Sequence, residues 1–321
     1  MSIVKEKVIV KKVNQEVFSA VLQEIAEQDR NVIVVTSDSR GSGKLIGFGE
    51  ALPEQIVEVG IAEQNLVGVA AGLASAGKKV FAVSPACFLT ARALEQIKND
   101  VAYSDNPVKL VGISAGVSYG ALGTTHHSLH DFAVLRAINN IIIVAPADGF
   151  ETEAAVRAAV KTNTPVYLRL GKKAMPLLTT DQRIGFEFGK GRIIKSGSNV
   201  AIIANGETVY PALLAAEKLE SEYGIQATVV SMHTIKPLDI GLLAKLADEN
   251  AAIITIEEHM INGGLGEACA AFLLQNGYKK SFKIMGIPDE YTVTGSQTEI
   301  LTHYGISREG IAEEVVKLLG R

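Results

Sequence analysis

Runs of apolar, β-branched residues alternate with amphipathic segments through the first half of the chain. The runs expected to form buried strands are residues 31–38, 79–84, 108–114, 141–148 and 165–170. Segments with helical spacing of apolar positions lie between them, at residues 17–28, 63–76, 89–103 and 150–162. Continuous apolar strands that alternate with helices are typical of a parallel sheet covered on both faces.

A second alternation of the same kind follows a break in the pattern. Residues 173–191 mix proline, glycine and charge, which is typical of a linker. The strands expected after it are residues 199–204, 226–232, 251–258 and 280–287, and the helices are residues 208–223, 240–249, 264–275 and 309–320. We therefore predict two α/β domains, residues 1–172 and 192–321, each a mostly parallel sheet flanked by helices.

The composition narrows the class of protein. Lys and Arg number 31 and Asp and Glu number 35, so the formal charge of −4 lacks the basic excess of a nucleic-acid-binding protein. No apolar run reaches the roughly 18 residues of a membrane helix, and the N-terminus has no continuous apolar signal core. Cys87 and Cys269 lie far apart and form neither a metal-binding spacing nor a disulfide framework. We therefore expect a cytoplasmic protein that binds neither nucleic acid nor membranes.

Two common nucleotide-binding motifs are absent from the sequence. No GxGxxG lies between a strand and a helix, and GSGK at residues 41–44 is too short for a phosphate loop. A nucleotide-binding domain of the usual kind is therefore not expected.

The most specific segment of the chain surrounds Glu63, in IVEVGIAEQNLVGVAAGLASAG at residues 56–77. A short strand is expected to end near Gly60, and Glu63 opens a helix rich in glycine and alanine. An acid in a first helical turn can simply favour the helix dipole. However, the carboxyl end of a parallel strand is also where such sheets build ligand sites, and the surrounding apolar residues solvate a carboxylate poorly.

Five motifs in order along the chain resemble the transketolase family. They are GIAEQN (60–65), VFAVSPACFLTARALEQI (80–97), YGALGTTHHSLHD (119–131), ANGETVYPALLAAEKL (204–219) and IEEHMINGGLGEA (256–268). The resemblance implies a thiamine diphosphate-binding fold that carries the pyrimidine site, followed by a transketolase C-terminal-like domain. It covers nearly the whole chain.

The family's diphosphate and Mg²⁺ signature, GDG followed by a distant asparagine, is missing here. The chain therefore resembles the C-terminal subunit of a split transketolase. The resemblance implies thiamine diphosphate as cofactor, with Mg²⁺ ligands supplied by a separate N-terminal subunit. It also implies an α2β2 assembly, or a homodimer of this chain.

The resemblance assigns four residues to the cofactor. Glu63 matches the family's catalytic glutamate, which hydrogen-bonds the aminopyrimidine ring and promotes its imino form, a role that a carboxyl group able to share a proton can perform. Phe88 matches the aromatic residue that stacks on the pyrimidine, where the alternative is an ordinary core phenylalanine. Ile61, in the glutamate motif, and Asp38, at a strand end, are expected near the cofactor; Asp38 could equally stabilise a turn.

Three of the six histidines fall in TTHHSLHD at residues 124–131. Because His126 and His127 are adjacent they point apart on any regular element, and we predict no metal site. The resemblance makes His126 the residue that contacts substrate oxygens and relays protons. It also places His127 at the substrate, whereas His130 has no assigned role.

The substrate's anionic end is expected to meet Ser42 and Lys172, where relatives bind a phosphate, and Arg92 is expected to add charge. Ser114 stands where the family has a histidine, and Leu122 lies where an acidic residue is expected. Ala91 and Leu94 replace two further aromatics of the cofactor pocket. These departures point away from the usual pentose and hexose phosphates.

The resemblance therefore implies transfer of a two-carbon ketol unit from a phosphorylated or otherwise anionic ketose to an aldose. Three alternatives stay open: the β subunit of a 2-oxo-acid dehydrogenase E1 component, 1-deoxyxylulose-phosphate synthase chemistry, and a non-catalytic partner subunit. The histidine motif differs from that of the dehydrogenases, and the synthases keep three domains in one chain. The presence of Glu63, Phe88 and His126 argues against a silent subunit.

Overall fold

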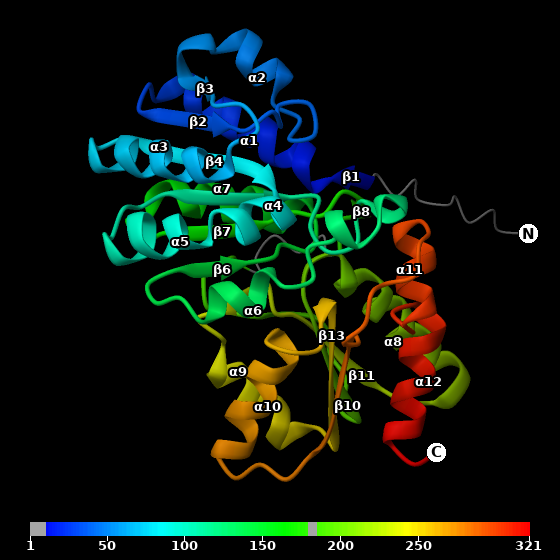
Figure 1. The fold of residues 1–321 in the computed structure, drawn as a ribbon. Helices are drawn as coiled ribbons and strands as arrows, with labels where there is room; N and C mark the ends of the chain where they lie inside the picture. Colours follow the sequence, from blue (N-terminus) through cyan, green and yellow to red (C-terminus); the bar gives the residue numbers. More distant parts are fainter. Residues whose placement is uncertain (1–10, 179–184) are drawn as a thin grey trace, which may run out of the picture.

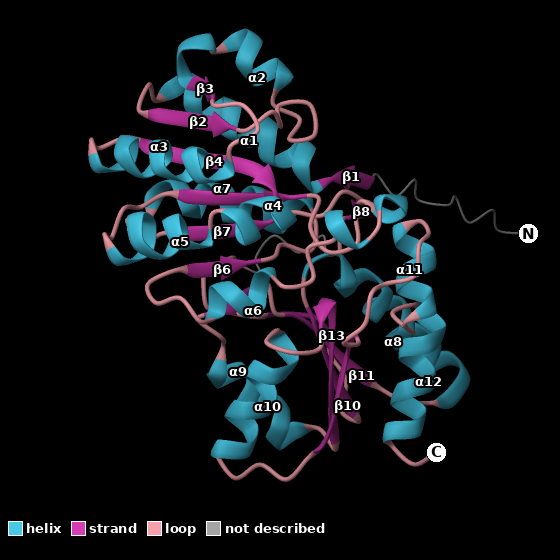
Figure 2. Ribbon diagram, in the orientation of Figure 1, coloured by secondary structure: helices cyan, strands magenta, loops and turns pink. Residues whose placement is uncertain are grey.

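Two sheets organise the chain in the computed structural model, which describes residues 11–178 and 185–321 (Figures 1 and 2). One of these large sheets has seven strands and the other five, and helices lie on both faces of each; a third sheet of two strands is described below. The predicted fold class, two mostly parallel sheets flanked by helices, is confirmed.

The seven-stranded sheet has the order β12-β6-β7-β5-β4-β2-β3. Its strands are β2 (Val32–Thr36), β3 (Ile56–Glu58), β4 (Lys79–Pro85), β5 (Lys109–Ile113), β6 (Ile142–Val144), β7 (Val166–Arg169) and β12 (Thr234–Lys236). All neighbours are parallel except the edge strand β12, which runs antiparallel to β6. Since β12 comes from the second half of the chain, the sheet joins both halves.

The helices of the first half cover the two faces of this sheet. They are α1 (Asn14–Gln28), α2 (Ile46–Ala51), α3 (Glu63–Ser75), α4 (Ala86–Arg92), α5 (Leu94–Gln96), α6 (Asp131–Arg136) and α7 (Gly149–Lys161), with short turns η1 (Pro53–Gln55), η2 (Ile97–Tyr103), η3 (Gly120–Leu122) and η4 (Thr124–His126). Phe18 of α1 packs with Val34 on one face, whereas Leu66 of α3 packs with Val35 on the other. Consecutive strand residues thus serve opposite helix layers, as their alternating direction requires.

The helix predicted over residues 89–103 is interrupted. Helix α4 ends at Arg92, and the stretch from Ile97 to Tyr103 winds as a wider π-helix. Ala93 lies between α4 and α5 with φ −104°, outside regular helical geometry. This break ends α4 beside the residues of the candidate site.

The five-stranded sheet has the order β14-β13-β10-β11-β9. Its strands are β9 (Arg192–Lys195), β10 (Val200–Ala204), β11 (Ala227–Ser231), β13 (Ala252–Met260) and β14 (Ser281–Ile287). The helices around it are η5 (Gly206–Thr208), α8 (Val209–Tyr223), α9 (Ile240–Glu249), α10 (Leu265–Gln275), α11 (Gln297–His303) and α12 (Arg308–Leu318). Figure 2 places α9 and α10 on one side of this sheet and α8 and α12 on the other.

Part of the predicted linker is ordered as a strand. Ala174–Pro176 forms β8, which pairs antiparallel with β1 (Lys11–Val13). Residues 179–184 of that linker lie outside the described part of the chain. This short pairing could not be predicted from the sequence pattern, because it joins segments far apart in the chain.

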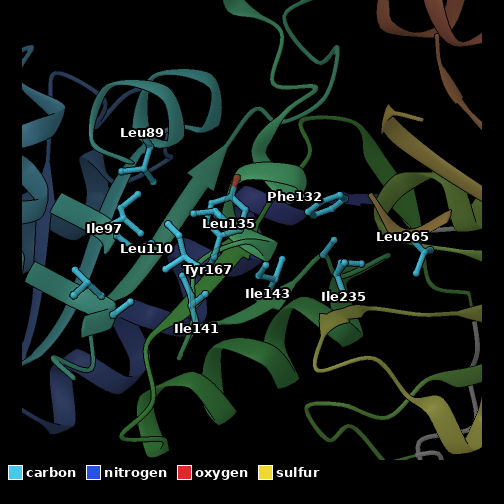
Figure 3. Packing of buried hydrophobic residues seen from close by; sticks show 14 of the residues in the cluster. Leu89, Ile97, Leu110, Phe132, Leu135, Ile141, Ile143, Tyr167, Ile235 and Leu265 are labelled. Atoms are coloured by element: carbon cyan, nitrogen blue, oxygen red, sulfur yellow. The ribbon is translucent and has the colours of Figure 1, made fainter. Parts of the chain in front are cut away.

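One hydrophobic cluster runs from the seven-stranded sheet into the second half. Leu110 and Ile143 of the first half share it with Ile235 and Leu265 of the second (Figure 3). The two halves therefore pack through a common core, which holds the loops between them in fixed positions. Among residues 11–178 and 185–321, every helix is too short or too polar to cross a membrane.

Candidate active site

Glu63 lies at the first position of α3, directly after the loop that leaves β3. Gly60 turns this loop with φ +74°, a backbone conformation that favours glycine. The Glu63 side chain is only 4% exposed, and both of its carboxylate oxygens accept a hydrogen bond from Arg92 Nη1, at 3.1 and 3.0 Å. The strand-end position expected from the sequence thus holds a buried carboxylate with one cationic partner.

Arg92 also covers the aromatic ring of Phe88. Its guanidinium carbon lies 4.3 Å from the ring centroid, a cation–π contact. Both residues belong to α4, one turn apart. Arg92 was expected at the substrate's anionic end, but the structure places its guanidinium on Glu63 and Phe88.

His126 lies between two aromatic rings. Its ring centroid is 5.3 Å from that of Phe88 and 5.6 Å from that of Tyr119, both at steep angles. Thr125 Oγ1 is 3.0 Å from His126 Nδ1. The contact with Phe88 brings the predicted catalytic histidine and the predicted stacking residue together.

Tyr119 gathers the residues expected at the anionic end of the substrate. Lys172 Nζ lies 5.3 Å from the centroid of the Tyr119 ring, and the side chains of Ser114 and Ser42 lie near the Tyr119 hydroxyl. Burial raises the pKa of Tyr119 above its ordinary value. Tyr119 was not among the residues predicted from the sequence, although it opens the motif that contains His126.

Ser114 and Asp38 share an unusual backbone. Each follows a strand of the seven-stranded sheet, β5 and β2 respectively, and has a positive φ of 52° or 51°. Non-glycine residues in this region are strained, and such residues cluster at functional sites. Both lie at carboxyl ends of parallel strands, the edge where α/β sheets bind ligands.

Asp38 and Ile61 border a separate shallow cavity, next to the loop before Glu63. Glu58 fixes this region because its Oε1 accepts hydrogen bonds from the backbone nitrogens of Asp38 and Gly60, at 2.7 and 2.9 Å. Burial alone would raise the pKa of Glu58, but these bonds and one from Thr36 hold it below its ordinary value. Ile61 is 74% exposed, so its apolar side chain faces outward from this loop.

His127 is buried and fully bonded within the chain. Its Nε2 donates to the Gly120 carbonyl at 3.0 Å, so Nδ1 accepts from Thr292 Oγ1 at 2.8 Å. Burial lowers the pKa of His127, which favours the neutral ring. These contacts tie the histidine loop to the second half of the chain, and the substrate role of His127 stays a prediction.

A cavity of about 870 Å³ opens beside these residues. Its lining includes Phe88, Arg92, Thr124 and His130 from the first half of the chain, and Met260 and residues 289–292 from the second. His130 Nε2 is 3.4 Å from Thr90 Oγ1, which gives this unassigned histidine a place at the cavity. The side chains of residues 289–292 were not expected there, because their approach depends on how the halves pack.

Within the described residues, no group of three or more His, Cys, Asp and Glu side chains is arranged to hold a metal ion. His126, His127 and His130 each contact different partners. The geometry is therefore that of a carboxylate and an aromatic face near a cavity whose lining is largely apolar with a few polar side chains. Such a set can bind a planar nitrogen heterocycle by stacking and hydrogen bonding.

Comparison with known proteins identifies the family. The family model described as "Transketolase, pyrimidine binding domain" matches residues 11–176, and "Transketolase, C-terminal domain" matches residues 189–311. The chain belongs to the transketolase family. Its resemblance to the C-terminal subunit of a split transketolase, inferred from the motifs, is confirmed. Members of this family depend on thiamine diphosphate.

Three transketolase relatives are similar over nearly their whole length. A subunit of apulose-4-phosphate transketolase from Phocaeicola vulgatus is 47% identical over 302 residues, which cover 94% of this chain and 96% of the relative. "Putative transketolase C-terminal section" of Methanocaldococcus jannaschii is 38% identical, covering 94% of each chain. The solved structure titled "Split gene transketolase, inactive beta4 tetramer" has a TM-score of 0.85 at 35% identity and covers 97% of this chain and 99% of its own.

Proposed function

We propose that this chain supplies the pyrimidine half of a thiamine diphosphate site shared with a separate N-terminal subunit. The complex would transfer a two-carbon ketol unit from a ketose to an aldose. The observation that carries the proposal is that one guanidinium, that of Arg92, both pairs with the buried Glu63 carboxylate and lies over the Phe88 ring, at the carboxyl end of the parallel sheet. In this structure a planar cation already stacks on Phe88 and donates to Glu63, so the pair fits a planar ring that carries an N–H donor or shares a proton.

When bound, thiamine diphosphate would supply the carbanion chemistry that breaks and forms the carbon–carbon bond. Glu63 would hold a proton at the aminopyrimidine ring nitrogen, and Phe88 would fix the orientation of that ring. His126, whose ring packs against Phe88, would move a proton at a substrate oxygen. Ile61 and Asp38 would border the cofactor from the neighbouring loops.

The Mg²⁺ that binds the diphosphate would take its ligands from the partner subunit. Support comes from the sequence, in which the family's diphosphate and Mg²⁺ signature, GDG followed by a distant asparagine, does not occur. The similar solved structure, titled an inactive tetramer of β chains, also supports dependence on a partner. We propose an α2β2 complex as the active form.

The substrate would be a sugar with an anionic end. Lys172, Ser42 and Tyr119 group three donors at one place, and an ammonium group favours an anion such as a phosphate. The Phocaeicola vulgatus relative is named for a phosphorylated ketose, which supports a sugar phosphate for this chain as well.

The test is reconstitution with an N-terminal transketolase subunit encoded beside this gene. The chain alone, the partner alone and the purified complex are assayed with thiamine diphosphate and Mg²⁺ on ketose phosphates with aldose acceptors. Ketol transfer by the complex alone is the expected result. Decarboxylation of 2-oxo acids without ketol transfer would favour a dehydrogenase subunit, and a complex that binds no cofactor would indicate a non-catalytic role.

A further inference from the structure

We propose that Arg92 is a placeholder for the cofactor's aminopyrimidine ring. In the chain without cofactor its guanidinium occupies Glu63 and Phe88, and it leaves both when the ring binds. The inference rests on the proposed function, because it takes Glu63 and Phe88 as the pyrimidine site. It adds a residue whose role is to hold that site and to compete for it.

The two occupants exclude each other because they need the same surfaces. Arg92 Nη1 bonds both Glu63 oxygens, and the guanidinium carbon lies 4.3 Å from the Phe88 centroid. Stacked aromatic partners keep their centroids about 4.5–7 Å apart. A pyrimidine ring on the same face of Phe88 would therefore lie where the guanidinium now lies.

The exposure of the Arg92 side chain allows it to leave Glu63 and Phe88. This side chain is 48% exposed although its partner Glu63 is only 4% exposed, so water can replace the hydrogen bonds that the guanidinium gives up when it leaves. By contrast, Arg169 is 5% exposed and bonds Asp131 together with two backbone carbonyls, so it is fixed in place. Arg92 can change partners by side-chain rotation at the end of α4.

The neighbouring cavity offers new partners to the Arg92 side chain once the cofactor has displaced it. Arg92 lines the cavity of about 870 Å³, whose lining also includes Asp289 and Glu290. Those carboxylates offer a guanidinium new partners near the substrate's expected position. The arginine predicted from the sequence to bind substrate would thus reach that position only after the cofactor is in place.

The placeholder has a physical purpose in the free subunit. Without a partner, Glu63 would be a nearly buried charge beside an aromatic ring, which is unfavourable. Arg92 neutralises that charge and keeps the carboxylate oriented. The consequence is a weaker apparent affinity for the cofactor, since the open site is only a fraction of the population.

The experiment measures the dissociation constant of thiamine diphosphate by titration calorimetry, using the complex with the N-terminal subunit and Mg²⁺. The variants are Arg92→Ala and Arg92→Lys, with Arg157→Ala as the matched control. Arg157 is also a half-exposed, ion-paired arginine, but it bonds Glu24 and Glu153 away from the site. We expect Arg92→Ala to bind about 3- to 10-fold more tightly, because the half-exposed guanidinium no longer competes for the buried Glu63 carboxylate and the Phe88 ring. Arg92→Lys should fall between, and Arg157→Ala should match the wild type.

Unchanged or weaker binding by Arg92→Ala would overturn the placeholder, with weaker binding showing that Arg92 helps to hold the cofactor. Failure of the proposed function gives a different result. If the wild-type complex binds no thiamine diphosphate, both ideas are wrong. If it binds the cofactor and Glu63→Gln loses activity while Arg92→Ala fails to tighten binding, only the placeholder is wrong.

Discussion

Glu63 combines burial, a strand-end position and a single exchangeable partner, and its proposed task depends on its acidity. Glu63→Gln keeps the shape and one acceptor oxygen but cannot give or take a proton. We expect turnover of the complex to fall by about 10²–10⁴-fold, the usual contribution of a general acid–base group. Proton exchange at C2 of the bound cofactor, followed by NMR in D₂O, measures the step directly. Exchange at the wild-type rate, with an unchanged melting temperature, would refute the assignment.

Substitution of Lys172 tests whether this residue binds the anionic end of the substrate. Replacing it with methionine keeps most of the apolar stem and removes the ammonium group beside Tyr119. We expect KM for an anionic ketose to rise roughly tenfold, the lower end of what a lost charge-assisted bond costs, because the site is open to water. A neutral analogue should be affected little.

Lys173→Met is the matched control, because the ammonium group of Lys173 bonds Thr298 of α11 instead of facing Tyr119. Its KM values should follow the wild type. If Lys172→Met changed KM equally for charged and neutral substrates, Lys172 would not be an anion ligand.

The sequence predicted individual site residues where a local motif carried them. Glu63, Phe88 and His126 lie in short motifs, and the structure packs Phe88 against His126 and links Phe88 to Glu63 through Arg92. The sequence alone could not predict the hydrogen bonds between Arg92 and Glu63, because 29 residues separate the two and the contact depends on how α4 packs against α3. Tyr119 was missed because its contacts with Lys172 and Ser42 join segments far apart in the chain.

At the scale of elements, the turn from β13 into α10 depends on one buried side chain. Glu257 Oε2 accepts from the Leu265 nitrogen at 2.7 Å, and Oε1 accepts from the Gly266 nitrogen at 2.9 Å. The first-turn nitrogens of α10 thus gain partners that the helix itself cannot provide. Gly264 leaves no room for a side chain against this carboxylate.

Glu257→Ala should therefore destabilise the protein. Two buried N–H groups would lose their acceptors, and we expect the free energy of unfolding in urea to fall by about 2–4 kcal/mol. Glu267→Ala is the control on the same helix, because its bond to the Gly263 nitrogen is exposed, and its loss should cost about 0.5 kcal/mol or less. Equal decreases in the free energy of unfolding for Glu257→Ala and Glu267→Ala would show that the burial of Glu257 does not increase the cost of losing its hydrogen bonds.

The periodic pattern of apolar residues predicted most strands and helices, because the apolar residues of each of these elements are buried against the adjacent sheet or helix layer. It failed where elements depend on distant partners. Thr234–Lys236 is too short to be recognised as a strand, and it exists by pairing with β6. The interruption after Arg92 was hidden because residues 89–103 keep helical spacing throughout.

At the scale of the whole molecule, two buried glutamates join the halves of the chain. Glu207 Oε1 accepts from the Lys173 nitrogen and Glu258 Oε1 from the Val117 nitrogen, each at 2.8 Å. Gln297 Nε2 donates to both, at 2.8 Å to Glu207 and 3.0 Å to Glu258. Val117 precedes the loop that carries Tyr119 and His126, so this junction also supports the candidate site.

The two buried carboxyl groups of this junction, those of Glu207 and Glu258, make the stability of the folded protein depend on pH. Burial and the neighbouring Glu258 carboxylate raise the pKa of Glu207 to about 8, despite the nearby Lys173 and the bond from Gln297. The pKa of Glu258 is raised too, by burial, although Arg169 opposes the shift. An acid with a raised pKa binds its proton more tightly in the folded state, so its stabilising contribution is complete below the unfolded value of 4.5 and is lost as pH rises through 8.

We therefore expect the free energy of unfolding to fall between pH 5 and 9 more steeply in the wild type than in Glu207→Gln, by on the order of a few kcal/mol across that range. Comparing the two proteins cancels the titrations of groups remote from the Glu207–Glu258 pair, such as that of buried Lys109, whose pKa of about 7 gives a slope of the opposite sign. Urea unfolding at five pH values measures the difference. If the free energy of unfolding had the same pH dependence in both proteins, Glu207 would have the same pKa in the folded and unfolded chains. The hydrogen bonds of Glu207 would then join the two halves without making the stability depend on pH.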